Sequence, residues 1–329
     1  MNNNKSILGI DIAKDKFNAT LLAGARTFRQ EFENHPRGFR ALRQWLARSG
    51  AQAVHAGLES TGRYGLALAR FLHAQGFTVS VLNPLALHHP QSRLQRSKHD
   101  RLDADLIAEY VAKESPAAWT PPTAAQTQLQ ELSRLLQARK RDLARERNRL
   151  ASLPQSRAAK AAIQRFIRLL EKEVDKLQAQ LLASLHLDPG MLSDWELLLS
   201  IPGIAELTAA IILAELPRTL PTARAAAAYS GLTPARHQSG TQDTTKGLTP
   251  IGNHTLRRAL YFPALTAITH NPPIHSKAAR LRLKGKAELC IIGAAMHQLL
   301  RQAWGVLKHK KPFDPSWTSR PLISVSAAV

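Results

Sequence analysis

The alternation of apolar and polar residues in the first 105 positions restricts the fold of this chain more than any other feature. Three short stretches alternate as antiparallel strands do, and helices and strands then follow in turn. The expected order is strands at 6–12, 16–22 and 27–33, a helix at 36–49, a strand at 53–58, a helix at 64–74, a strand at 78–82 and a helix from 101. This order predicts a mixed sheet with helices on its faces.

Four acidic residues occupy positions where such a sheet can collect carboxylates. Asp11 lies on the first strand, and Glu59 ends the fourth, which should neighbour the first. Asp100 and Asp103 are three residues apart, so they share one face of a helix. An RNase H-like α/β domain, which has this element order, would bring all four together. The sequence therefore predicts a cluster of four carboxylates.

Such a cluster requires cations. Two carboxylates about 5 Å apart repel by roughly 3 kcal/mol at an effective dielectric near 20. Mg²⁺ ions would relieve this repulsion and would suit the cleavage of a phosphodiester. Any one of these acids alone is more often a helix cap, a turn residue or a surface charge, and we interpret Asp15 and Asp105 as solvated charges.

The charge of the chain indicates a nucleic-acid partner. The 329 residues carry a net charge of +21, of which +6 falls in residues 1–115, +7 in 116–185 and +8 in 186–329. Because the excess is spread over the whole length, we expect every part of the chain to face phosphate. With 44% hydrophobic residues the chain can still build two or three cores.

The sequence contains a single cysteine, which limits the thiol-based sites that one chain can form. Cys290 stands in the apolar run CIIGAAMHQLL, so we expect a buried thiol, and neither a disulfide nor a cysteine-based zinc site within one chain. The beginning of the chain shows no signal-peptide core, and no apolar run approaches membrane-spanning length. We therefore expect a bacterial cytoplasmic, nucleoid-associated protein without a membrane partner.

A proline-rich break at 121–122 ends the first predicted domain, residues 1–120. Residues 121–186 follow as a helical region with leucines and isoleucines at heptad spacing, which predicts two coiled-coil helices of about 28 residues each, packed as a hairpin or as a dimer. Basic residues on the outer faces are either phosphate contacts or an ordinary solvated surface. The candidate contacts are Arg139, Lys140, Arg141 and Arg145.

Residues 187–329 form the third predicted domain, mainly α. Two apolar helices joined at Ile201-Pro202-Gly203-Ile204 suit a helix-hairpin-helix, with Gly203 near a DNA phosphate, and they suit a plain helical hairpin equally well. A glycine- and threonine-rich loop then carries Arg236 and Ser239, before a basic helix start at Arg257 and Arg258. We include Arg236, Arg257 and Arg258 among the candidate nucleic-acid contacts.

Several motifs, in order along the whole chain, make it resemble a known family. They are GIDIAKDKF, LESTGRYG, VLNP, HDRLDA, PAAW, SIPGI, AYSGLTP, QSG, LRRALY and GVLKHKKPFD. Each motif is weak alone, but their order and spacing are specific. The chain is similar in these motifs to the insertion-sequence-110 family of DEDD transposases, the RNA-guided bridge recombinases.

The resemblance implies a RuvC-like domain, a coiled-coil region and a C-terminal transposase domain with a nucleophilic serine. Carried over to this sequence, the family's DEDD set falls on Asp11, Glu59, Asp100 and Asp103, which would bind Mg²⁺, and its serine falls on Ser239. That serine would attack a phosphodiester and form a 5′-phosphoserine intermediate. The implied partners are donor and target DNA, a noncoding bridge RNA, and further copies of the chain in a dimer that assembles to a tetramer.

Two other functions remain open at this stage. A RuvC-like, structure-selective DNA nuclease would use the same carboxylates with water as the nucleophile, and would not require Ser239. A non-catalytic protein that assembles on nucleic acid would use the positive charge alone. A covalent bond between protein and DNA would distinguish recombination from the nuclease, because only attack by a serine leaves one.

Overall fold

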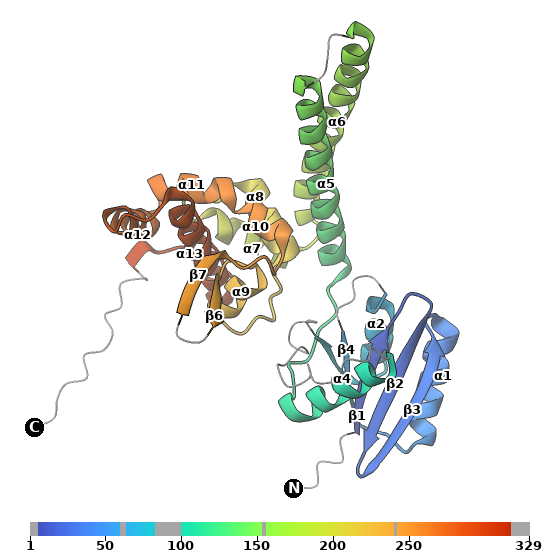
Figure 1. The fold of residues 1–329 in the computed structure, drawn as a ribbon. Coiled ribbons are helices and arrows are strands. Elements are labelled where there is room, and N and C mark those ends of the chain that lie inside the picture. Colours follow the sequence, from blue (N-terminus) through green and yellow to red (C-terminus); the bar gives the residue numbers. More distant parts are fainter. Residues whose placement is uncertain (1–5, 60–63, 83–99, 153–155, 240–241, 317–329) are drawn as a thin grey trace, which may run out of the picture. The chain divides into compact units, whose positions relative to one another are not determined.

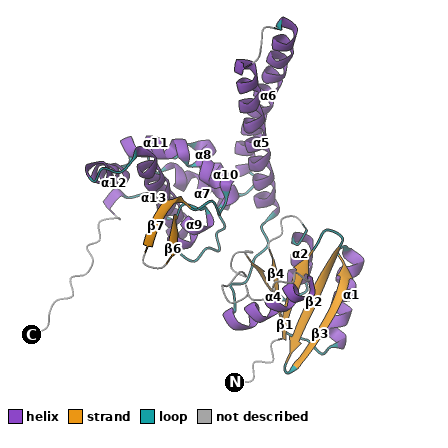
Figure 2. Cartoon of the chain, in the orientation of Figure 1, coloured by secondary structure: helices purple, strands orange, loops and turns teal. Residues whose placement is uncertain are grey.

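The computed structural model describes residues 6–59, 64–82, 100–152, 156–239 and 242–316, without the side chains of 100–102, 236–239 and 242–246. The chain divides into two compact units, Met1–Pro121 and Pro122–Val329. The first contains a sheet with helices, and the second is mostly helical (Figures 1 and 2). A mixed α/β region followed by a helical one is the expected organisation.

The first unit is built on a five-stranded sheet. Its strands are β1 (Ser6–Ile12), β2 (Lys16–Ala23), β3 (Arg26–Glu33), β4 (Val54–Glu59) and β5 (Thr78–Leu82). They lie in the order β3-β2-β1-β4-β5, so that β1 is central. β1 pairs antiparallel with β2 and parallel with β4, and β4 pairs parallel with β5. The predicted strand positions are confirmed to within one or two residues.

Helices cover both faces of this sheet. α1 (Pro36–Arg48) and α2 (Leu66–Ala74) cover one face, and their core with β1 contains Leu42, Leu46, Leu68 and Leu72. α4 (Asp100–Glu114) packs on the other face, where Ile107 and Val111 meet Leu82. Residues alternate between faces along a strand, so the odd-numbered residues of β1 face α4. Among the described residues of this unit, the element order βββαβαβα is confirmed.

Two helices of equal length begin the second unit. α5 (Ala124–Ser152) and α6 (Arg157–Leu185) pack against each other along most of their length (Figure 1). Lys140 bonds to Gln178, and Arg147 bonds to Glu171. Seven residues toward the C-terminus of α5 therefore match seven residues toward the N-terminus of α6. This register makes the pair an antiparallel hairpin. The predicted heptad leucines at 129, 136 and 143 are buried.

The rest of the second unit is a helical bundle with one small hairpin of strands. Side chains cap several of its helices, for example Asp188 before α7 and Thr222 before α9. The elements are α7 (Pro189–Leu199), α8 (Glu206–Glu215), α9 (Ala223–Tyr229), β6 (Pro234–Ser239), β7 (Gln242–Leu248), α10 (His254–Ala259), α11 (Tyr261–His270), α12 (Pro272–Leu283) and α13 (Glu288–His309).

Two expectations about this unit are wrong. Cys290 is exposed, because it lies in the first turn of α13 on the side away from the buried Ile291 and Ile292. Arg257 and Arg258 lie in the last turn of α10 and not at its start, where their charges complement the helix dipole. Among the described helices, none combines the length and the apolar character needed to cross a bilayer.

Candidate functional site

The strand register places Asp11 and Glu59 next to each other. β1 and β4 pair in parallel with Ile10 opposite Leu58, and both acids follow directly in their strands. Residues in register on neighbouring parallel strands lie about 5 Å apart and point to the same face of the sheet. Both side chains are half-buried. The two carboxylates therefore belong to one edge and one face, at the carboxyl ends of the strands.

Two glycines fix α4 against that face. A Cβ on Gly9 would lie 2.1 Å from the carbonyl oxygen of Ala104, and one on Gly57 would lie 2.3 Å from Val111 Cγ2. Neither position tolerates a side chain, so the helix backbone lies directly on the sheet. Asp11 and Glu59 are the next residues on the same face as these glycines.

The direction of α4 brings its first turn toward the two acids. Ile7 of β1 shares a pocket with Ala112, whereas Gly9 meets Ala104 and Ala108. β1 and α4 therefore run in opposite directions. Beyond Gly9, the next residue of β1 on this face is Asp11, and the turn of α4 that precedes Ala104 holds Asp100 and Asp103.

The acidic side chains do not form a complete ligand set in this structure. Asp103 is exposed, and the side chain of Asp100 lies outside the described residues. Among the side chains that are described, no three from Asp, Glu, His and Cys come together closely enough to hold a metal ion. The first turn of α4 thus points toward the edge that holds Asp11 and Glu59, and the assignment of the four acids as ligands stays a prediction.

Asp105 is not the solvated charge that we expected. Its carboxylate accepts a 2.7 Å hydrogen bond from Thr20 Oγ1 on β2, and Nε and Nη2 of Arg29 on β3 donate to its two oxygens at 2.9 Å and 3.0 Å. Burial opposes ionisation, but the hydrogen bonds from Arg29 and Thr20 and the charge of Arg29 outweigh it, so the pKa of Asp105 lies below its ordinary value. Asp105 therefore links α4 to β2 and β3 of the sheet.

Ser239 ends a strand and does not lie in the loop that we expected. It is the last residue of β6 and pairs with Gln242 of β7, while residues 240–241 lie outside the described part. The threonines at 244 and 245 and the Gly-Thr pair at 240–241 are sequence signals for a hairpin that could have indicated this. The side chains of Arg236 and Ser239 are among those not described.

The base of this hairpin is fixed to the helices around it. Arg257 donates to the main-chain oxygens of Ser230 at 3.2 Å and of Ile251 at 2.9 Å. Thr249 N donates to Thr233 O at 3.0 Å. Burial lowers the pKa of Arg257. This arginine therefore has a structural role, whereas Arg258 beside it is exposed.

Most candidate phosphate contacts on α5 already have partners. Asp142 pairs with Arg139 at 2.9 Å and with Arg145 at 2.7 Å, and Lys140 bonds to Gln178 at 3.1 Å. Arg141 is exposed. These pairs favour the ordinary solvated surface, and phosphate contact at these residues stays a prediction.

Gly203 has a structural reason to be glycine. Its φ is +104°, and a Cβ would lie 2.8 Å from that of Ala267 on α11. Asn271 donates to the neighbouring Pro202 O at 3.2 Å. The turn between α7 and α8 is therefore pressed against the helical bundle, and its contact with DNA stays a prediction.

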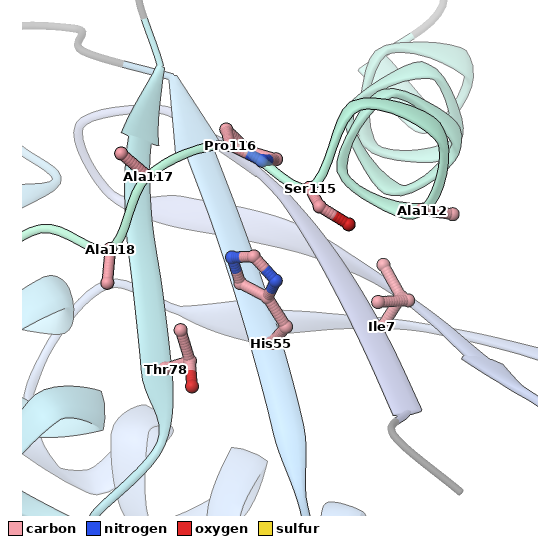
Figure 3. A pocket seen from close by; sticks show the side chains of 8 residues that line it. All are labelled: Ile7, His55, Thr78, Ala112, Ser115, Pro116, Ala117 and Ala118. Carbon is pink, nitrogen blue, oxygen red and sulfur yellow. The ribbon is translucent and has the colours of Figure 1, made fainter. Parts of the chain in front are cut away.

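A pocket of about 520 Å³ lies at the opposite edge of the sheet (Figure 3). Its wall includes Ile7, His55 and Thr78, which lie within the first two residues of the three parallel strands β1, β4 and β5. His55 Nε2 lies 2.8 Å from Ser80 Oγ, and Ser80 donates to the main-chain oxygens of the segment at 116–117. Ligands of open α/β sheets bind at the carboxyl ends of strands, which favours the edge with Asp11 and Glu59 as the candidate site over this pocket.

Comparison with known proteins identifies the family. Residues 8–155 match the profile of the DEDD transposases of the IS110 group, and residues 195–279 match that of the transposase IS116/IS110/IS902 family. The chain is 32% identical over 319 residues to the pilin gene-inverting protein of Moraxella bovis, covering 94% of this chain and 98% of that protein. The chain belongs to the IS110 family of transposases.

Other relatives agree with this assignment. The pilin gene-inverting protein of Moraxella lacunata is 31% identical over 94% of this chain and 98% of its own length. The transposase for insertion sequence element IS1328 of Yersinia enterocolitica is 25% identical over 78% of this chain and 82% of its own length. This IS110-family protein is thus a DNA transposase or recombinase, and DNA is its substrate.

Proposed function

We propose that this IS110-family transposase is an RNA-guided DNA recombinase of an insertion sequence. Asp11, Glu59, Asp100 and Asp103 hold Mg²⁺, and Ser239 is the nucleophile. The observation that carries the proposal is the register of β1 and β4, which sets Asp11 beside Glu59 at the edge where α4 begins. We assign the sheet to the RNase H-like, RuvC-like fold, which its strand order β3-β2-β1-β4-β5 supports.

The donor chemistry of the four residues suits magnesium. Carboxylate oxygens are the protein ligands that Mg²⁺ prefers, and four of them on one edge would repel one another without a cation. Bound Mg²⁺ would supply Lewis-acid activation of the phosphate and stabilisation of the leaving oxygen. The exposed position of Asp103 leaves room for DNA and metal to approach together.

Serine supplies the covalent step. The Ser239 hydroxyl oxygen attacks the phosphorus of a DNA strand and loses its proton, and a phosphoserine ester forms. The bond from phosphorus to the 3′-oxygen breaks, and that oxygen leaves as a 3′-hydroxyl after it gains a proton. A 3′-hydroxyl of another strand then attacks the phosphoserine and releases Ser239. The energy of the bond is conserved in the ester, so strands are rejoined without a high-energy cofactor.

The relatives support joining as well as cutting. Two of them are named as proteins that invert a pilin gene, and inversion of a segment requires that every cut strand be rejoined. Hydrolysis by water would leave the ends free. We therefore favour recombination over a structure-selective nuclease.

Three functional regions follow from this proposal. Residues 1–120 are the catalytic DEDD domain, residues 121–186 the coiled-coil region, and residues 187–329 the transposase domain with Ser239 and a helix-hairpin-helix at Gly203. A noncoding bridge RNA pairs with donor and target DNA and carries the sequence information. Dimers of the chain assemble into a tetramer that brings the strands together.

Sequencing of the RNA that purifies with the full chain tests this function. The protein is expressed with the flanking DNA of its element, and bound RNA is compared with RNA from a strain without the protein. One defined species with two guide loops, together with plasmid recombination that depends on it, is the expected result. Recombination without any bound RNA contradicts RNA guidance, and strand cleavage without rejoining supports the nuclease.

A further inference from the structure

Four basic residues converge along the contact between α12 and α13, which pack side by side (Figure 1). Lys277 and Arg280 are one turn apart on α12, and His297 and Arg301 are one turn apart on α13. Lys277 Nζ lies 3.5 Å from the carbonyl oxygen of Ala294, one turn before His297. Lys277 therefore lies against the turn of α13 that precedes His297, close enough for its charge to act on His297 and for the charge of Arg301 to act on it.

The surroundings of Lys277 and His297 disfavour the protonated form of both side chains. Lys277 is half-buried because its neighbours Ile274 and Ala278 lie in the core. Burial and the charges of Arg301 and Arg280 lower the pKa of Lys277. Burial, Lys277 and Arg301 likewise lower the pKa of His297. The positive charges around Lys277 and His297 thus disfavour protonation of both side chains.

Several basic residues elsewhere in this unit have acidic partners. Arg282, also on α12, pairs with Glu288 at 2.7 Å, and Arg134 pairs with the buried Glu215 at 3.0 Å. Within the described residues, no carboxylate forms an ion pair with any member of the α12–α13 cluster. A group of cations held together without an acid is suited to bind an anion.

We propose that Lys277 and Arg301, supported by Arg280 and His297, bind the phosphate backbone of a nucleic acid. The inference rests on the proposed function only for the choice of nucleic acid as the anion. Phosphate oxygens accept hydrogen bonds from the ammonium of Lys277 and the guanidinium of Arg301, and their charge offsets the repulsion between the two helices. None of these residues belongs to the proposed catalytic set.

Binding by single-charge variants of the full chain tests this site. Lys277→Gln and Arg301→Gln are compared with Arg282→Gln, which removes the same charge from the same region but from a residue already paired with Glu288. The probes are a labelled DNA duplex and a labelled RNA hairpin. Fluorescence anisotropy is measured in EDTA over a range of salt concentrations, so the result does not depend on strand cleavage.

Lys277→Gln and Arg301→Gln should each weaken binding of at least one probe about 5-fold and reduce its salt slope by roughly 1, whereas Arg282→Gln changes neither by as much. The probe that responds identifies DNA or RNA as the ligand, and a response of both indicates a general phosphate site. Equal losses in all three variants, or unchanged slopes, overturn the proposal. Arg301 is exposed, so Arg301→Gln still tests the proposal where Lys277→Gln perturbs folding.

Discussion

Asp11 and Glu59 stand side by side at the carboxyl ends of β1 and β4, one residue beyond the paired Ile10 and Leu58. They are 48 positions apart in the sequence, and the parallel pairing of two strands alone makes them neighbours. The face that they share is the one on which α4 lies, held there by Gly9 and Gly57. This relationship gives a physical basis to the proposed metal site.

Asp11→Asn and Glu59→Gln should each lower recombination by about 100-fold or more, because a lost ligand removes several kcal/mol of transition-state stabilisation. Asp15→Asn is the matched control, since Asp15 is an exposed acid in the turn after β1. Recombination of a reporter plasmid is measured over a range of Mg²⁺ concentrations. Full activity of either site variant, or an equal loss in Asp15→Asn, would show that the metal is held elsewhere.

Substitutions of the acidic residues on α4 should distinguish residues with a catalytic role from residues with a structural role. Asp100→Asn and Asp103→Asn are expected to lower activity far more than stability. Asp105→Ala leaves the buried hydroxyl of Thr20 without its partner, which costs about 1 to 3 kcal/mol of unfolding free energy. Thermal and denaturant unfolding of the full chain measure this. Identical losses of activity at normal stability for Asp103 and Asp105 variants would contradict the separation.

Asp105 also makes stability depend on pH. Its folded pKa is lowered, so its contribution to stability is complete above the pKa of the unfolded state, which is about 4, and is lost as the pH falls through the folded value. Unfolding between pH 7 and pH 2 should show a smaller acid-induced loss in Asp105→Ala than in the wild type. The same acid dependence in both proteins would mean that Arg29 and Thr20 do not stabilise the ionised carboxylate.

Gly9→Ala should displace α4 and lower both stability and activity. The new Cβ would overlap the carbonyl oxygen of Ala104, and the cost of such overpacking is about 2 kcal/mol or more. Gly305→Ala is the control, because nothing lies within 4 Å of a Cβ there, and alanine in a helix is about 0.5 to 1 kcal/mol more stable than glycine. A neutral Gly9→Ala would mean that α4 does not lie directly on the sheet.

Local patterns predicted the first unit well. Strands that alternate in polarity, such as 6–12, and helices with one apolar face, such as 36–48, depend on residues near one another in the sequence. The adjacency of Asp11 and Glu59 was predictable as well, because it follows from strand order. The leucine spacing of α5 and α6 likewise predicted their length and their buried seam.

Partners that are distant in sequence could not be predicted. Asp105 is fixed by Arg29, 76 positions away, and the buried Glu215 by Arg134, 81 positions away. Cys290 stands in an apolar run, but its exposure depends on which side of α13 meets the core. The cationic cluster of α12 and α13 depends in the same way on how two helices pack, and no single stretch of sequence reveals it.

The most direct test of the account is the detection of a covalent bond between Ser239 and DNA. The full chain, with any RNA that purifies with it, is incubated with Mg²⁺ and labelled donor DNA. The protein is then denatured, and the site of the label is mapped by mass spectrometry. We predict a 5′-phosphoserine at Ser239 that is absent from Ser239→Ala and strongly reduced in Asp11→Asn. An adduct on another residue, or recombination by Ser239→Ala at the wild-type rate, would contradict the account.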